Sequence, residues 1–416
     1  MAELDILTQP LAASSPISPE ALACPHQYNE RLRNEAPVYQ CPHSGIFFVS
    51  DYDTVREIAR DHETFSNKFG QAMRPMQEVD PEIAAIQAQG YKSVDTMLTE
   101  DPPVHRRYRG LVNQAFTARR VSTLEPDIAR ICNELIDKML AKKEVDFVIE
   151  FAEPVPLIVI AEQLGVSLDD YELFKTWSDA FVAQLSGMAD RNQQLESARL
   201  IVQFQKYFAS RLEDRKAHPQ DDIISDIVHA EIEDELPLDT PEMLSILQQL
   251  LVAGNETTTS SIAEGVLLMI QYPQQFAKLK ANPDLVDNLV EEVLRLSTPT
   301  ANMWRVATKD TEIQGVPVPT GSMVMIKFSS ANRDQGVYPE PHTFDVERNN
   351  AKTQIAFGYG VHMCVGASLA RKEMNVAFRC LLERINQFEL IDENAALNYP
   401  PNVLLRGLSS LPLRVS

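Results

Sequence analysis

The longest helix-like pattern of apolar positions in the chain lies between Pro241 and Tyr272. Thr240 followed by Pro241 is typical of a helix N-cap with proline at the first helical position, and Pro273 marks the other end. The pattern predicts one helix about 45–50 Å long, at 1.5 Å per residue. Its two ends are apolar, but its middle reads AGNETTTSS, which is rich in weak helix formers. A polar middle of this kind indicates a solvent-facing stripe, a kink or a functional groove.

A second helical pattern follows the stretch 357–366, which reads FGYGVHMCVG. Apolar or small residues recur there at steps of three and four, which places them on one helical face. These positions are Ala370, Met374, Ala377, Leu381, Ile385 and Phe388. Cys364 therefore lies directly before a helix, where backbone N–H groups can donate toward sulfur and favour a thiolate. Three glycines, Gly358, Gly360 and Gly366, permit tight turns and the close approach of a large flat ligand.

Between these two patterns the sequence predicts a further helix and a group of strands. The segment 291–306, EEVLRLSTPTANMWRV, puts Glu292 and Arg295 three positions apart on one helical face. The segment 311–330, TEIQGVPVPTGSMVMIKFSS, is strand-like. The strands are few and do not alternate regularly with helices, which argues against a doubly wound sheet. We therefore expect a mainly α fold with a small β-rich lobe.

The composition of the 416 residues is that of one globular domain, with 44% hydrophobic and 23% charged residues and no linker, low-complexity tract or repeat. Residues 1–20 lack the basic start and the apolar run of a signal peptide or membrane anchor. We expect them to form a partly disordered extension before a single domain, residues 21–416. The formal net charge of −21 argues against nucleic acid as a partner. We expect a soluble, cytoplasmic monomer without membrane contact.

The five cysteines do not form a recognisable framework. Their number is odd, their spacings are wide and no C-x-x-C pair occurs, so disulfides and a cysteine-cluster zinc site are not expected. By residue chemistry alone, Cys364 could be a nucleophile, a metal ligand or a buried thiol. A hydrolase that uses Cys364 with His362 as its base is disfavoured. The two residues are too close in the chain for the usual arrangement of nucleophile, base and orienting group.

The stretch FGYGVHMCVG matches the pattern F-x-x-G-x-[HR]-x-C-x-G and resembles the cysteine loop of the haem-thiolate monooxygenases, the cytochrome P450 superfamily. The resemblance extends in element order over residues 20–414. It implies the fold of that family, a triangular helical prism with a small β-rich lobe. It also implies haem b as cofactor, with Cys364 as the iron ligand and Phe357 and Gly366 in the loop around it. The reaction it implies is the insertion of one atom of O2 into an organic substrate.

Three further segments carry the resemblance. Residues 253–258, which begin with Ala253, are similar to the family's [AG]-G-x-[DE]-T-T groove. The resemblance implies that Glu256 and Thr257 are the acid and the alcohol that handle dioxygen and protons. The E-x-x-R pattern at 292–295 implies a buried charge network behind the haem. Its members would be Glu292, Arg295 and Arg348. We assign this network a structural role.

The segment 101–109 matches D-P-P-x-H-x-x-x-R, whose histidine and arginine bind the haem propionates in the family. Two other cationic residues complete the set that the resemblance implies. The propionate ligands would be His105, Arg109, Arg305 and His362. Four such donors suit two buried carboxylates, which need charge-assisted hydrogen bonds.

The electron source is expected to be a separate protein. No G-x-G-x-x-G stretch opens a helix after a strand, so neither a flavin nor a nicotinamide domain is fused to the chain. The segment 104–120 contains five arginines and no acid, and the helix after Cys364 adds further basic residues. We interpret these as a cationic surface for an acidic ferredoxin, which its reductase would supply with electrons. The surface residues are Arg106, Arg107, Arg119, Arg371 and Lys372.

The substrate pocket is expected to be mainly aliphatic, which favours a small hydrophobic substrate such as a terpenoid, steroid, fatty acid or aromatic compound. The candidate pocket residues are Met73, Met76, Phe181, Leu247, Leu251, Val252, Met303, Val403 and Leu404. Two alternatives remain open at this point, a peroxide-using peroxygenase and a non-catalytic haem-thiolate sensor. The presence of both Glu256 and Thr257 favours monooxygenation, because neither alternative needs this pair.

Overall fold

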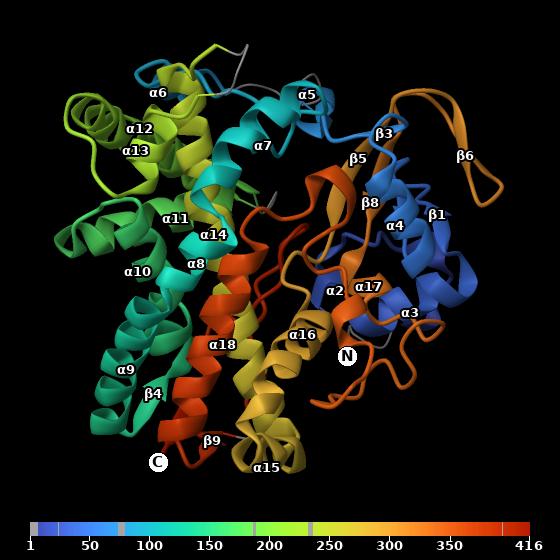
Figure 1. Ribbon diagram of the computed structural model, residues 1–416. Coiled ribbons are helices and arrows are strands. Elements are labelled where there is room, and N and C mark those ends of the chain that lie inside the picture. The colour runs from blue at the N-terminus through green and yellow to red at the C-terminus, as the bar shows by residue number, and fades with distance from the viewer. Residues whose placement is uncertain (1–6, 24, 74–79, 186–188, 232–235, 393) are drawn as a thin grey trace.

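The computed structural model describes residues 7–23, 25–73, 80–185, 189–231, 236–392 and 394–416, and its chain is mainly helical (Figure 1). In Figure 1 the long helices fill the left and centre of the molecule. The largest sheet lies to the right, with α4 (Tyr52–Arg60) beside it. The division into a large helical part and a small β-rich part is the one that the sequence predicts.

The helical part surrounds two clusters of buried apolar side chains, one of which joins the front half of the longest helix to its neighbours. Burial of these apolar faces is the main force that holds the helices together. The longer helices are α3 (Pro25–Glu35), α7 (Val104–Ala115), α9 (Glu125–Lys142), α10 (Pro154–Gln163), α11 (Tyr171–Leu185), α12 (Arg191–Ala217), α14 (Thr240–Gln271), α16 (Val286–Ser297) and α18 (Ala367–Arg384). The shorter helices, besides α4, are α2 (Pro19–Ala23), α5 (Phe69–Met73), α6 (Pro81–Gln87), α8 (Ala118–Thr123), α13 (Ile223–Val228), α15 (Pro273–Ala281) and α17 (Phe328–Ala331).

The largest sheet has the strand order β1-β2-β8-β5-β3. Its strands are β1 (Val38–Gln40), β2 (Phe47–Val49), β3 (Phe65–Ser66), β5 (Met303–Ala307) and β8 (Met323–Ile326). β2 and β8 are parallel, and the other pairs are antiparallel. Because side chains alternate along a strand, Arg305 and Trp304 lie on opposite faces of this sheet.

Two smaller groups of strands complete the described secondary structure. One sheet has the order β4-β10-β9, and a hairpin joins β6 to β7. Their bounds are β4 (Glu144–Asp146), β9 (Phe388–Leu390), β10 (Pro412–Val415), β6 (Thr311–Ile313) and β7 (Val316–Val318). The strands β6, β7 and β8 all fall within the segment 311–330, where the sequence predicts strands.

The predicted long helix is confirmed as α14, but its N-cap is Asp239 and not Thr240. The Asp239 carboxylate accepts from the Glu242 N–H, and the Glu242 carboxylate accepts from the Asp239 N–H, each at 2.8 Å. This reciprocal pair satisfies two donors at the helix start and begins the helix one residue earlier than the threonine–proline order predicts. The middle of α14 is α-helical throughout. It is buried from Thr258 to Ser261, whereas Ala253 is exposed and Gly254, Glu256 and Thr257 are partly buried, so one side of the polar middle is accessible.

The helix after Cys364 is confirmed as α18, but it is shorter than the apolar pattern predicts. It ends at Arg384, and Phe388 begins β9, where it pairs with Val415 of the C-terminal strand. The partner of Phe388 is distant in sequence, so the helical spacing of this residue gave the wrong prediction. The two long helices α14 and α18 pack closely, since a Cβ on Gly265 would lie 2.4 Å from the Phe378 ring.

The described part of the N-terminal extension is packed against the domain. Leu7 and Leu11 contact a cluster formed by Ala21, Tyr28 and Leu32, and the Tyr39 hydroxyl donates to the Leu11 carbonyl at 2.9 Å. Residues 7–20 therefore do not form a disordered segment, because apolar side chains anchor them on α3. We propose that they belong to the single domain. In the described part of the chain, no helix has the length and apolar character needed to span a membrane.

Candidate active site

The cysteine loop, residues 357–366, turns sharply before α18 begins. Gly360 has a φ of 77°, and a Cβ there would lie 2.7 Å from the Ala59 carbonyl oxygen, so this position requires glycine. The Cys364 N–H donates to the Phe357 carbonyl at 2.9 Å, which closes the loop. The loop thereby fixes the sulfur at the N-terminal end of α18, which runs through the centre of the molecule (Figure 1).

The Cys364 sulfur receives the backbone N–H groups of Gly366 and Ala367, as the sequence predicts. Burial nevertheless raises the pKa of the Cys364 thiol, and this effect outweighs these N–H groups and the nearby Arg109 and Arg371. The N–H groups therefore favour a thiolate, as the sequence predicts, but they do not outweigh burial. A metal ion bound to the sulfur would supply the positive charge that the protein alone does not provide.

Four basic side chains gather beside this loop. His105 and Arg109 lie one turn apart on α7, Arg305 lies on β5 and His362 lies in the loop. The His105 and His362 ring centroids are 4.4 Å apart. Burial lowers the pKa of Arg305 to about 10, and its guanidinium donates to the Trp304 carbonyl at 2.7 Å. The structure thus brings together residues from three distant segments of the sequence.

These basic groups are short of acceptors. Both ring nitrogens of His105 are buried without a hydrogen-bond partner among the described residues. Burial, followed by the charges of His362 and Arg109, lowers the pKa of His105 to about 4. His105 is therefore neutral at pH 7, while Arg109 and Arg305 stay charged. Unpaired buried polar atoms beside two guanidinium groups favour an anion. Two carboxylates at this position would satisfy these groups.

Asp101 is a residue of this site that the sequence analysis missed, although it begins the D-P-P segment. Its carboxylate lies 3.4 Å from His362 Nε2 and accepts from the Ser66 hydroxyl and the Asn67 N–H. Burial alone would raise the pKa of Asp101, but the hydrogen bonds from His362, Ser66 and Asn67 lower it to about 2. One charged acid therefore faces four basic groups, and the cluster keeps a positive surplus.

The middle of α14 holds the predicted acid and alcohol. The Thr257 hydroxyl donates to the Ala253 carbonyl at 2.9 Å, while the Asn255 amide donates to the Ser178 hydroxyl at 3.0 Å and anchors the helix on α11. Burial, followed by the charges of Asp179 and Glu153, raises the pKa of Glu256 to about 7. The acid can therefore exchange a proton near neutral pH.

The chain of polar groups near Glu256 leads outward along α11. Lys175 lies 2.6 Å from Glu153 and 3.0 Å from Asp179, and the Asp179 side chain is 60% exposed. The sequence analysis did not find these residues, because their spacing from Glu256 in the chain gives no hint of contact. Their charges act on the Glu256 carboxyl, and Asp179 lies at the surface.

The charge network of Glu292, Arg295 and Arg348 is assembled in the core. Arg295 donates to Glu292 at 2.7 and 2.8 Å, and Arg348 donates to the same carboxylate at 2.9 Å. Glu292 and Arg295 are both 0% exposed. The remaining guanidinium N–H groups donate to backbone carbonyls, so that the buried charges are paired.

Comparison with known proteins gives a single family. The cytochrome P450 family model matches residues 171–407. The polyketide biosynthesis cytochrome P450 PksS of Bacillus subtilis is 34% identical over 398 residues, covering 93% of this chain and 94% of its own. The chain belongs to the cytochrome P450 family. A steroid C26-monooxygenase of Mycobacterium tuberculosis is 33% identical over 92% of this chain and 98% of its own. The structure of cytochrome P450 CREJ in complex with (4-ethylphenyl) dihydrogen phosphate superposes with a TM-score of 0.90, at 30% identity, covering 97% of this chain and 100% of CREJ.

Members of this family are monooxygenases that bind haem b through a cysteine thiolate, and the residues of this P450 fit that group. Cys364 offers one buried sulfur at a helix start, and the cationic cluster offers donors for two carboxylates. When bound, thiolate-ligated haem supplies the activation of dioxygen.

The candidate pocket residues of this P450 do not all lie together. Phe181, Leu247 and Leu251 are at most 1% exposed in the helical core, and Phe181 packs edge-on against Phe204, so they are core residues here. Val403 and Leu404 contact the face of the large sheet that carries Trp304, whereas Met303 contacts the opposite face. Val252 lies on α14 directly before Ala253. Met76 and the side chain of Met73 lie outside the described residues.

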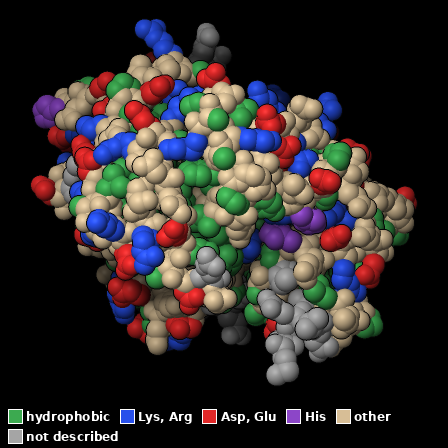
Figure 2. Space-filling view, turned by 90° about the horizontal axis from the view of Figure 1, so that it is seen from below, with side chains coloured by type: hydrophobic (Ala, Val, Ile, Leu, Met, Phe, Trp, Pro, Cys, Tyr) green, Lys and Arg blue, Asp and Glu red, His purple; other side chains and the backbone are tan. Residues whose placement is uncertain are grey.

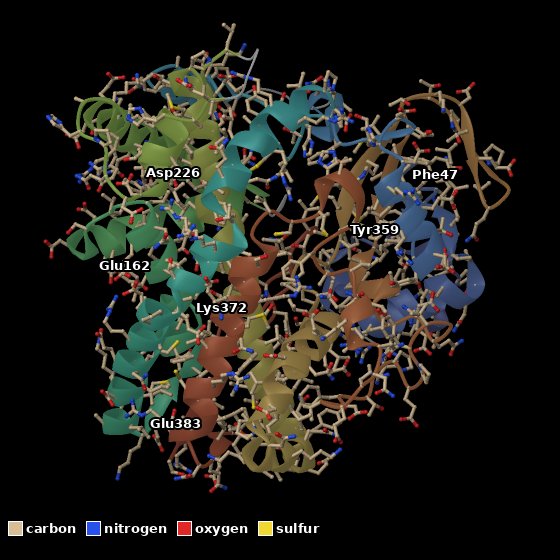
Figure 3. The ribbon with its side chains drawn as sticks, in the orientation of Figure 1. Phe47, Glu162, Asp226, Tyr359, Lys372 and Glu383 are labelled. Carbon is tan, nitrogen blue, oxygen red and sulfur yellow. The ribbon has the colours of Figure 1, made fainter. Side chains whose placement is uncertain are left out.

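Three of the five predicted docking residues are paired within the chain. Arg107 lies 2.6 Å from Glu242, Arg371 lies 2.6 Å from Glu291, and Lys372 lies 2.6 Å from Glu125. Lys372 is labelled on α18 in Figure 3. Arg371 also stacks over the Phe357 ring at 4.5 Å, so it supports the cysteine loop. Arg106 and Arg119 are exposed, and within the described chain no ion pair holds either.

Proposed function

We propose that this P450 oxidises a small hydrophobic molecule, that Cys364 binds the haem iron, and that Glu256 and Thr257 deliver protons in the oxygen groove. The observation that carries the proposal is the half-buried acid in the middle of α14, whose pKa of about 7 suits proton transfer at neutral pH. A carboxyl that has no role in proton transfer would be an expensive group to bury at this position.

The two groove residues have different parts in this proposal. The Thr257 hydroxyl hydrogen is committed to the Ala253 carbonyl, so its oxygen lone pairs are the part that can accept a hydrogen bond in the groove. Glu256 exchanges protons with solvent through the polar groups around Lys175. In this proposal, protons enter from the surface near Lys175 and reach the groove at Thr257.

Replacement of Glu256 by glutamine is expected to lower product formation by about 10²-fold, because the amide cannot transfer a proton. Below about pH 7 the wild-type carboxyl is protonated and can donate, and above this pH it must first be reprotonated. The wild-type rate should therefore fall as the pH rises through about 7, and E256Q should lose this inflection. Product formation is measured against pH with saturating reductant.

Thr257 provides the matched test of the alcohol. Thr257→Ala should keep NADPH consumption but divert electrons from product to peroxide, whereas Thr257→Ser, which keeps the hydroxyl, should retain coupling. Full coupling in Thr257→Ala, or an unchanged pH profile in E256Q, would contradict the proposed proton path.

The substrate class is the least constrained part of the proposal. Met303, Val403 and Leu404 are the apolar candidates that are only partly buried, and they support a hydrophobic ligand. The similar proteins include one named for polyketide biosynthesis, one named for a steroid and one in complex with an aryl phosphate. Titration with terpenes, steroids, fatty acids and aromatic compounds, followed by the spin-state change of the haem, would identify the class.

We propose an acidic ferredoxin as electron donor, which docks around Arg106 and Arg119. These two arginines are exposed, and they lie in a segment of the chain without acids. On the face seen in Figure 2, acidic and basic side chains are interspersed, so that a docking surface on this protein has to be local. Long-range attraction between opposite charges would then raise the association rate.

The double variant Arg106→Glu, Arg119→Glu is expected to slow reduction by ferredoxin about tenfold at low ionic strength, with the difference shrinking as salt is added. Stopped-flow reduction with ferredoxin and its reductase gives the rate. Arg199→Glu on α12, also an exposed arginine, is the matched control and should have no effect. Equal rates for both variants would remove α7 and α8 from the docking surface, while unchanged substrate affinity in the double variant would show an intact site.

The rival functions make different predictions with the same proteins. A peroxygenase would form product from peroxide as fast as from NADPH, and a sensor would consume no NADPH when its ligand binds. The Glu256–Thr257 pair supports the monooxygenase, because only a reaction that starts from O2 needs two delivered protons.

A further inference from the structure

A second group of basic side chains lies away from Cys364, where the N-terminal helices meet the C-terminal loop. Lys327 is buried in this group, whereas His26, Arg333 and Arg406 are half-buried. It adjoins a small pocket between the segment 16–25, the ends of β5 and β8, and the loop 400–406. In Figure 1, α2 and α3 lie next to α17 in this region. Asn302 and Lys327 line the pocket and flank the paired residues Met303 and Ile326. Because Asn302 is three residues before Arg305, the two point to opposite faces of β5, and the pocket is separate from the cysteine site.

The pocket is lined by cations without acids. Lys327 and Arg406 line it, and none of its lining residues, all of which the structure describes, is acidic. Lys327 is 3% exposed, and burial lowers the pKa of its amine to about 8. The amine lies 5.9 Å from the centroid of the Phe48 ring. A buried ammonium group without an acid is unusual, since burial alone favours its neutral form.

Behind Arg406 the positive surplus continues. Nη1 of Arg406, Nε of Arg333 and Nδ1 of His26 are buried without a hydrogen-bond partner among the described residues. Arg406 stacks over the Tyr399 ring at 3.6 Å, and Arg333 reaches His342 Nδ1 at 3.1 Å, so neither contact supplies a negative charge. Each unpaired buried donor costs free energy that a suitable acceptor would recover.

The nearby acids do not balance this charge. Glu264 on α14 interacts electrostatically with both Arg333 and Arg406. Burial raises the pKa of the Glu264 carboxyl, which favours its neutral form. Arg33 is also near Arg333, but its charge is met by Asp334 and Glu30. Two guanidinium groups therefore share at most one negative charge, which leaves room for one more anion.

We propose that this P450 binds a small monovalent anion, of the size of chloride or formate, at Arg406 with Arg333 and His26 as neighbours. The pocket is small and admits only a particle not much larger than water, which excludes phosphate esters and other large anions. Lys327 at the other side of the pocket attracts the anion, and guanidinium N–H groups bind it.

Anion binding here would fasten the loop 400–406 to α14 and to the N-terminal helices. Arg406 follows Val403 and Leu404 in this loop, and the loop is already attached to the sheet by the Ala301 N–H, which donates to the Leu404 carbonyl at 2.8 Å. The bound anion therefore stabilises the folded enzyme and makes its thermal stability depend on the identity of the anion.

The experiment measures the melting temperature of the haem-loaded enzyme against chloride or formate concentration, with ionic strength held constant by sodium gluconate, whose anion is too large for the pocket. A saturable rise is expected for chloride and formate. Arg406→Gln should weaken the apparent affinity about tenfold or more, because it removes the charged donor. Arg414→Gln, a surface arginine on β10 that pairs with Glu144, is the matched control and should keep the rise.

A second variant tests the same site in case Arg406→Gln folds poorly. Lys327→Met fills a similar space without the charge. It should lower the apparent affinity for the anion several-fold and leave the haem spectrum unchanged. Crystals soaked in bromide should show an anomalous peak next to Arg406. A rise that is linear and equal for all anions and variants, or a water molecule alone at this position in the bromide crystals, would overturn the proposal.

Discussion

Replacement of Cys364 by histidine is expected to abolish monooxygenase activity and to move the carbon monoxide band of the reduced protein to the position of histidine-ligated haem. The thiolate donates the electron density that favours cleavage of the O–O bond, and an imidazole donates less. Cys364 is placed for this role by the loop that Gly360 turns and by the Phe357 carbonyl that holds its N–H. The measurement is the absorbance spectrum of the dithionite-reduced protein with and without carbon monoxide.

The matched control for this variant is Cys380→Ala. Cys380 lies on α18, the helix that follows the cysteine loop, is buried and contacts Cys132, so it tests whether a change of another thiol alters the haem. The control should keep the red-shifted band. A Cys364→His protein that kept this band, or a Cys380→Ala protein that lost it, would show that Cys364 is not the iron ligand.

Replacement of Glu292 by glutamine is expected to destabilise the protein by about 3–5 kcal/mol, because it leaves two buried guanidinium groups without their shared carboxylate. Arg295 is fully buried and cannot turn to solvent. The loss should appear as a lower midpoint in denaturant, with release of haem along the same transition. Glu292 lies on α16, and the segment around Arg348 leads to the cysteine loop. We therefore expect unfolding of the core and loss of the haem to occur in one transition.

An exposed ion pair gives the comparison for this prediction. Glu144 and Arg414 lie 2.7 Å apart on β4 and β10, and both side chains are about half exposed. Glu144→Gln should change the free energy of unfolding by less than about 1 kcal/mol. Equal effects for Glu292→Gln and Glu144→Gln would mean that the buried network contributes no more than a surface pair.

Several features of this P450 could be predicted from sequence because they depend on neighbours in the chain. The apolar spacing between residues 240 and 271 is sufficient for one long helix, and the E-x-x-R spacing is sufficient to pair Glu292 with Arg295 one turn apart. Predictions from local spacing failed where a distant segment competes for the residue. Phe388 has helical spacing, yet it pairs with the C-terminal strand.

The pairing of the basic surface residues also could not be predicted from local spacing. Five basic residues look alike in the sequence, but Arg107, Arg371 and Lys372 are each neutralised by an acid from another helix, and Arg106 and Arg119 are not. Ion pairs of this kind join residues far apart in the chain, such as Lys372 and Glu125. Spacing along the chain carries no information about them.

The sequence by itself determined the family, the mainly helical fold and the identity of the residues in the cysteine loop and groove, because each of these is encoded in short motifs. Only the tertiary structure decided the electrostatic state of those residues. Burial raises the pKa of Cys364 and brings that of Glu256 to about 7, and Asp101 joins the cationic cluster through contacts with Ser66 and His362. The physical reason is that desolvation and Coulomb interactions depend on distance in space, and the fold alone sets that distance.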